Sequence, residues 1–257
     1  MSLLDDITSK YIKQENVNTE LLEKVKMVLE ANGMPTINLD SNVNSLIITK
    51  TNDRSVIGNY KKDKNKLVYS DDASYVHELF HVASSNRDKK NNSGIRITIH
   101  DRDSLIGLDE GITDYLTSQT GYETNECGLL RLCVELIVLV RGKKALIPYC
   151  ENDGVKFCNQ FSKEFLKLAH LLDEYYYSFL NLINFNGVMM SHEYFELQEQ
   201  TEKKLIQALE LMIEFFTTKE FKCKEYLIDK INSGYLKKEF SVLGIESIDK
   251  IFPKGLK

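Results

Sequence analysis

The sequence predicts an α+β fold that is predominantly helical, with its few strands confined to the first half of the chain. From about residue 123 onward, the apolar residues recur only at helical spacing. Short alternating segments, which are typical of strands, occur only before that point. The chain has 257 residues, of which 42% are hydrophobic and 28% charged, as expected of a globular protein with one domain or two small ones.

The N-terminal half is expected to combine one helix with a few strands. Residues 17–32 have the spacing of an amphipathic helix, and residues 37–50 are interpreted as strand. Residues 55–60 and 67–69 flank a charged turn, which is the pattern of a β-hairpin. Residues 95–100 alternate in the same way and predict another short strand.

A helix is predicted over residues 73–85, directly after the second strand of the hairpin. Asp71, Asp72 and Ser74 are the candidate N-caps of this helix. The apolar positions that would face the core are Val76, Leu79, Phe80 and Val82. A second amphipathic helix is predicted from about residue 107, ending near Gly121.

The C-terminal half is predicted to contain only helices, with glycine and proline near the breaks between them. The predicted helical segments are residues 123–141, 157–184, 192–217 and 219–232. The predicted organisation is an N-terminal part, residues 1–122, and a helical part, residues 123–257, that closes a cleft. A single continuous domain is the alternative, because no linker marks the boundary.

The residues His77-Glu78-Leu79-Phe80-His81 form the pattern HExxH within the first of these two predicted helices. Because an α-helix repeats about every 3.6 residues, side chains at i and i+4 project from one face. Two histidines placed in this way can share one zinc ion, and the glutamate between them can reach water at the metal. The alternative is an ordinary pair of buried, hydrogen-bonded histidines. A glutamate beside an apolar face favours the metal site, since burying it is costly without a partner or a function.

A third ligand is predicted from the second helix, whose sequence over residues 107–117 is GLDEGITDYLT. Glu110 and Asp114 are again four residues apart and therefore share one face of that helix. One carboxylate can bind the metal while the other accepts the ring N–H of a ligating histidine. Taken alone, the pair is more typical of a solvated acidic face than of a metal site, but the preceding HExxH favours the metal site.

Together, HELFH and GLDEGITDYLT resemble the glutamate-zincin, or gluzincin, group of metallopeptidases. Members carry HExxH on one helix and a glutamate ligand, usually in the context N-E-x-x-x-D, on the next. The resemblance implies that His77, His81 and Glu110 bind zinc (Zn²⁺). It also implies that Glu78 is the general base and that Asp114 is the partner of His77.

The resemblance further implies a zincin-like core, with a small antiparallel sheet or hairpin packed on the HExxH helix. In the group, the edge strand of this sheet pairs with an extended peptide substrate. In this chain the hairpin either serves that purpose or only shields the helix. Asp109 stands where asparagine is commoner, and the interval between the two motifs is longer than in thermolysin-like members, so the intervening loop must differ. The resemblance covers about residues 55–120.

The predicted function is therefore hydrolysis of peptide or protein substrates by a zinc metallopeptidase with Glu78 as the general base. Candidates for stabilising the oxyanion, among which spacing does not choose, are His100, Tyr149, His170, His192 and Tyr194. The alternative function is a zincin-like regulatory or partner-binding module that holds metal without hydrolysing peptides.

Charge and composition predict neither a nucleic-acid partner nor a membrane span. The net charge is −5, and the lysine-rich stretches at residues 61–66 and 88–90 are interpreted as solvated turns. The most apolar run, residues 127–140, is too short to span a bilayer and contains Arg131 and Glu135 at i, i+4 spacing. Five cysteines without CxxC spacing predict reduced thiols, and the N-terminus does not read as a signal peptide. The expected location is the cytoplasm.

Overall fold

The computed structural model describes residues 12–52, 58–89, 93–99, 102–124, 127–185, 191–216 and 223–247. Their helices and small sheets confirm the predicted α+β, mostly helical class. The described residues form two compact units. The first comprises those up to Thr98 together with Thr113–Thr124 and Leu146–Phe157, and the second comprises those within Ile99–Ile112, Asn125–Ala145 and Cys158–Lys257. The division predicted near residue 123 stays a prediction.

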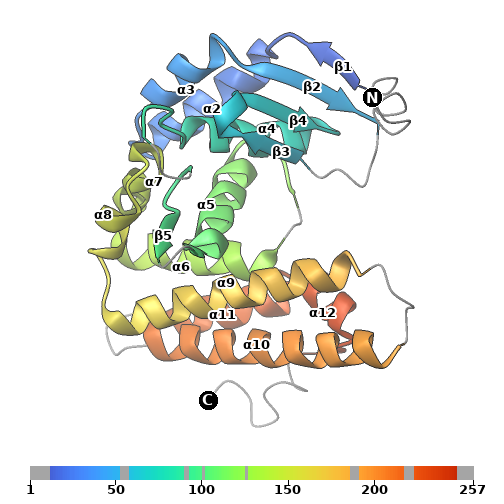
Figure 1. Cartoon of the computed structure of the whole chain (residues 1–257). Coiled ribbons are helices and arrows are strands. Elements are labelled where there is room, and N and C mark those ends of the chain that lie inside the picture. Colours follow the sequence, from blue (N-terminus) through green and yellow to red (C-terminus); the bar gives the residue numbers. More distant parts are fainter. Residues whose placement is uncertain are drawn as a thin grey trace. The chain divides into compact units, whose positions relative to one another are not determined.

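The first unit contains a four-stranded sheet with the strand order β1-β2-β4-β3 (Figure 1). Its strands are β1 (Ile12–Glu15), β2 (Ile47–Thr51), β3 (Gly58–Lys61) and β4 (Lys66–Tyr69). The outer pairs are antiparallel, whereas β2 and β4 are parallel. The expectation of an antiparallel sheet was therefore wrong for the central pair. The chain reverses direction between β2 and β3 and again in the hairpin, so β4 enters the sheet in the direction of β2.

The predicted hairpin is confirmed for the described residues. Strands β3 and β4 pair through a register that joins Gly58 to Tyr69 and Lys61 to Lys66. A 3₁₀ turn, η1 (Lys62–Lys64), connects them, and Asn65 closes it in a left-handed conformation with a φ of 45°. Residues 55–57 of the predicted first strand lie outside the described residues.

The predicted HExxH helix is confirmed as α4 (Asp72–Ala83), which begins only three residues after β4 ends. Of the candidate caps, Asp71 is the N-cap: its side chain accepts a hydrogen bond from the backbone of Ser74 at 2.8 Å. The Ser74 hydroxyl accepts one in return from the Asp71 backbone, which completes a capping box. Helix α4 packs on β3 and β4, with α2 (Thr19–Ala31) against it as well. The sheet therefore determines where the motif begins.

Residues 37–43 correct the prediction of strand over residues 37–50, because they form a helix, α3 (Ile37–Val43). Only the end of that segment enters the sheet, as β2. The physical reason is a non-local contact: the buried Asn42 amide donates to the carbonyls of Val82 and Ser85, at 3.0 and 2.7 Å. These carbonyls lie at the end of α4, where helical acceptors lack partners within the helix. Helix α3 thus caps the motif helix through a contact that local propensity does not encode.

The predicted short strand and second amphipathic helix are both present. Strands β5 (Ile97–Ile99) and β6 (Arg102–Ser104) form a two-stranded sheet, and α5 (Ile106–Gln119) follows. Leu105, just before α5, has a φ of 67°, a left-handed conformation that costs a non-glycine residue roughly 1 kcal/mol. The carboxylate of Asp173 holds this turn, accepting hydrogen bonds from the backbone of Leu105 and Gly107 at 2.8 Å each.

The second unit is mainly helical, and its four predicted helices are confirmed with somewhat shorter bounds. They are α6 (Gly128–Arg141), α9 (Lys163–Ile183), α10 (His192–Phe216) and α11 (Cys223–Asn232). The long helices α9 and α10 lie side by side (Figure 1), and α10 also contacts α6, α11 and a helix that was not predicted, α12 (Lys237–Leu243). Arg131 and Glu135 form the expected pair on α6, 3.3 Å apart.

Two further short helices, α7 (Ile147–Glu151) and α8 (Gly154–Cys158), were not predicted. Across the described ranges, no helix has both the length and the apolar character that crossing a membrane requires.

The buried Asp173 predicts a dependence of stability on pH. Burial raises its pKa to about 6, although two backbone hydrogen bonds oppose the shift. Since an unfolded aspartate has a pKa of about 4, the native state alone keeps this proton between about pH 4 and pH 6. The protonated Asp173 therefore contributes to the free energy of unfolding below pH 4. This contribution, at most about 3 kcal/mol, is lost as the pH rises through 6.

We therefore expect Asp173→Asn to become more stable relative to the wild type as the pH rises from 4 to 7. Urea unfolding at several pH values measures the difference in free energy of unfolding between the two proteins. Asp229→Asn, at an exposed position on α11, is the control with the same change in charge. A difference between Asp173→Asn and wild type that stays constant across this range would contradict the expectation.

Candidate metal centre

The two histidines of HExxH lie on one face of α4 and their rings converge. The Nε2 atoms of His77 and His81 are 3.2 Å apart. Both side chains are buried, with 3% and 6% of their surface exposed. The predicted i, i+4 placement therefore brings together two nitrogen atoms in the interior of the protein.

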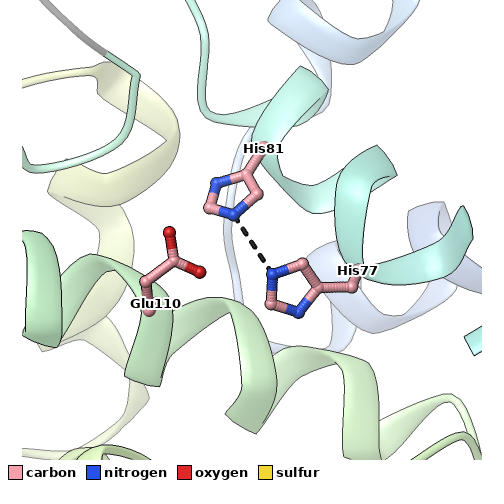
Figure 2. A group of neighbouring side chains, drawn as sticks. All are labelled: His77, His81 and Glu110. Atoms are coloured by element: carbon pink, nitrogen blue, oxygen red, sulfur yellow. Dashed lines mark hydrogen bonds between the residues drawn. The ribbon is translucent and has the colours of Figure 1, made fainter. Parts of the chain in front are cut away.

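Glu110 completes a group of three potential metal ligands. Figure 2 shows its carboxylate reaching from α5 toward the two histidine rings. One ligand atom from each of the three side chains lies within 4.8 Å of the others. Among the described residues, no other cluster of histidine, cysteine or carboxylate side chains meets this condition.

The donor atoms present fit a zinc ion. In a tetrahedral site with Zn–N distances of about 2.0–2.1 Å, two nitrogen ligands are separated by roughly 3.3 Å. The observed separation of 3.2 Å agrees with that value. A metal-free pair of neutral histidines sharing one proton would have a similar separation, so the distance alone does not distinguish the two states. The carboxylate beside the pair adds the third ligand of a two-histidine, one-glutamate zinc site with a fourth position open.

Asp114 approaches His77 from the side opposite to this group. Its Oδ1 atom is 3.0 Å from Nδ1 of His77, and both side chains are buried. The carboxylate favours the proton on Nδ1, which leaves the lone pair on Nε2, the atom that faces His81. Thr124 donates a hydrogen bond to the same Asp114 oxygen and so helps to hold it in place. The contact between Asp114 and His77 is the one that the sequence led us to expect.

Glu78, on α4, is buried against the first residue of β3. Only 6% of its surface is exposed, and its carboxylate lies directly against the Cα of Gly58. A Cβ atom on Gly58 would come within 2.7 Å of the nearer carboxylate oxygen. No motif in the sequence predicted this contact. The glycine inside a predicted strand was the available signal, because such glycines often mark a close approach of another group.

Two glycines in α5 have a similar role. A Cβ atom on Gly111 would lie 2.6 Å from the carbonyl oxygen of Leu130 in α6, and one on Gly107 would lie 3.0 Å from that of Leu172 in α9. Both contacts are with backbone, which yields less readily than a side chain. A glycine inside a helix lowers the stability of the protein by about 1 kcal/mol relative to alanine. Glycines at two positions of a predicted helix were therefore a signal in the sequence for close packing. The neighbour of Glu110 thus allows α5 to pack closely on α6.

The described candidates for oxyanion stabilisation lie outside the group of three ligands. Tyr149 is fully buried, and its hydroxyl bonds to that of Thr113 at 2.7 Å. His170 and His192 are exposed on α9 and α10, where each lies near a glutamate four residues ahead. Tyr194 packs against aromatic rings on α10 and before it. His100 lies outside the described residues.

Comparison of the chain with protein-family models, with curated proteins and with solved structures found no match to any of them. The resemblance to gluzincins therefore depends on the two motifs alone, and the zincin-like core stays a prediction.

Proposed function

We propose that this protein is a zinc-dependent peptidase of the gluzincin type. In this proposal the zinc ligands are His77, His81 and Glu110. The observation that carries the proposal is the convergence of two buried histidines and the half-buried Glu110, with the buried Glu78 one residue from the first histidine. A metal site with a structural role alone has no use for a buried glutamate beside it, because burying a carboxylate is costly.

The chemistry divides among the residues as follows. A bound zinc ion would polarise the scissile carbonyl and lower the pKa of the attacking water. Glu78 accepts the proton of that water during the attack and donates it to the leaving amine. Asp114 keeps His77 in the tautomer whose Nε2 is available as a ligand.

The sheet supports a peptide as the substrate. Strand β3 is last in the strand order, and Gly58 at its beginning lies against Glu78. The outer backbone edge of such a strand can pair with an extended peptide by β-augmentation. A peptide bound in this way would pass close to the Glu78 carboxylate.

The proposal is tested by metal content together with hydrolysis. Protein purified in chelator-free buffer at neutral pH is expected to contain about one zinc per chain and to cleave members of a mixed peptide library. A chelator should abolish cleavage, and added zinc should restore it. Stoichiometric zinc without cleavage would favour the metal-binding regulatory or partner-binding module. Absence of zinc binding would refute both functions.

Gly58→Ala tests whether the position of Glu78 matters. The added methyl group would displace the Glu78 carboxylate, because the closest contact would be only 2.7 Å. We expect a fall in kcat of roughly 10- to 100-fold, since small misplacements of catalytic groups have effects of this size. Zinc content should be unchanged. Asn59→Ala, at the exposed neighbouring position on β3, is the matched control. Loss of zinc in Gly58→Ala, or full activity, would contradict this account.

A further inference from the structure

The first unit contains a polar pocket of about 960 Å³ beyond the C-terminal end of α4. Four of its lining residues are cationic: Lys62, Arg87, Lys89 and Arg96. Two are acidic: Asp63 and Asp88. The lining therefore has an excess of positive charge in a chain whose net charge is −5. A pocket with such a lining attracts ligands that carry negative charge.

Two of these cations are fixed next to each other by neutral acceptors. The Lys62 ammonium donates to the carbonyl of Lys89 and to the side-chain carbonyl of Asn152, at 3.1 and 3.3 Å. The Lys89 ammonium donates to the carbonyls of Glu151 and Asn152, at 2.8 and 3.1 Å. Burial lowers the pKa of Lys62, and the charge of Lys89 lowers it further. An anion in the pocket would relieve this repulsion.

The remaining groups provide directed donors for such an anion. Arg87 lies just after α4, and one of its guanidinium nitrogens donates a hydrogen bond to the hydroxyl of Ser45 at 3.1 Å. A guanidinium presents five N–H donors and pairs with carboxylates in a bidentate manner. Arg96 provides a second guanidinium in the lining. Tyr60 also lines the pocket, and burial raises its pKa to about 12, so it adds no negative charge.

The pocket is close to Glu78 along two elements. On β3, Gly58 contacts Glu78 and Tyr60 lines the pocket, and two residues of strand span about 7 Å. Gly58 and Tyr60 point to the same face of the strand, because side chains alternate. On α4, the helix ends at Ala83, five residues and roughly 8 Å after Glu78. These two spans put the pocket lining on the order of 10 Å, measured along the backbone, from Glu78 and from the glycine that contacts it.

We propose that this pocket is a subsite for a carboxylate of the peptide substrate, borne by an acidic side chain or by the C-terminus. At about 3.3 Å per extended residue, that carboxylate would lie roughly three or four residues from the scissile bond. This proposal rests on the proposed peptidase function. It implies that the peptidase prefers peptides that carry a negative charge. Lys62 and Lys89, each from a lysine-rich stretch that was interpreted from the sequence as a solvated turn, both line this pocket.

Binding can be measured apart from hydrolysis by using the full chain with Glu78→Gln. The probes are peptides that carry a single glutamate, placed at a different position in each peptide. Each has a control peptide with glutamine in place of the glutamate. Every peptide is made with a free and with an amidated C-terminus. Fluorescence anisotropy is expected to show about tenfold tighter binding for the charged member at one position, or for the free C-terminus. This difference should shrink as salt is raised.

Arg87→Gln in the same background should bring the charged and neutral peptides to within about twofold of each other, because one bidentate partner is lost. Lys64→Gln is the matched control, since Lys64 is exposed in the same turn as Lys62 and is not part of the lining. Arg96→Gln provides a second test, and circular dichroism verifies folding. A preference that survives in folded forms of both arginine variants would overturn the subsite.

The failure of this proposal differs from the failure of the proposed function. A charge preference in binding, abolished by Arg87→Gln but without cleavage by wild type, would leave the subsite standing and refute the peptidase. Cleavage with equal kcat/KM for charged and neutral peptides would refute the subsite alone. If no peptide bound at any position, the subsite would be refuted.

Discussion

Replacement of Glu78 by glutamine is expected to lower kcat by about 10²- to 10⁴-fold, the usual contribution of a general acid–base residue. Glutamine keeps the size of the side chain and its packing against Gly58 but cannot accept the proton of the attacking water. Zinc content should remain at the wild-type level, because Glu78 is not one of the three proposed ligands. The measurement is steady-state hydrolysis of the best library peptide, with zinc determined in the same sample.

Glu123→Gln is the matched control for this substitution, since Glu123 is exposed and lies after α5. It should retain wild-type kcat and zinc. If Glu78→Gln kept more than about a tenth of the wild-type kcat, Glu78 would not be the general base.

Replacement of Glu110 by alanine is expected to weaken zinc binding by about 100-fold or more. Loss of a residue that only supports a ligand typically costs 10- to 100-fold in metal affinity, and loss of a ligand should cost at least as much. Glu110 is only half-buried, and alanine has a high helix propensity, so α5 should remain folded. Competition titration against a chromophoric chelator gives the affinity directly.

Glu123→Ala tests the removal of a carboxylate away from the ligand group and should leave the affinity unchanged. An unchanged affinity in Glu110→Ala would show that the convergence of Glu110 with the histidines has another cause. Two histidines alone would then bind the metal, and the assignment to the gluzincin type would be wrong.

The elements that were predicted correctly have signals contained within a few residues. Asp71 and Ser74 are three residues apart, and the spacing of a capping box indicates a helix start whatever the rest of the fold. The same holds for His77 and His81, whose relation follows from helical geometry once α4 is given. The convergence of Glu110 on them was predicted from the motifs rather than from local geometry.

The errors and omissions involve contacts between distant segments. Asn42 draws residues 37–43 into a helix by bonding to the end of α4, about forty residues further along the chain. Gly58 and Glu78 are likewise brought together only by the packing of α4 on β3. The hydrogen bond from Lys62 to the carbonyl of Lys89 joins two segments that were interpreted from the sequence as solvated turns, and both residues line the pocket. None of these partners can be identified from composition or periodicity.

The strand order has a consequence for the sequence of events during synthesis. Strand β4 lies between β2 and β3 but is the last of the three to leave the ribosome. Until Tyr69 has emerged, neither neighbour has its native partner on that side, although β1 and β2 can already pair. Because α4 begins three residues later, insertion of the central strand and docking of the histidine helix become nearly one step. The nascent chain thus acquires its sheet and two of its three proposed ligands almost together.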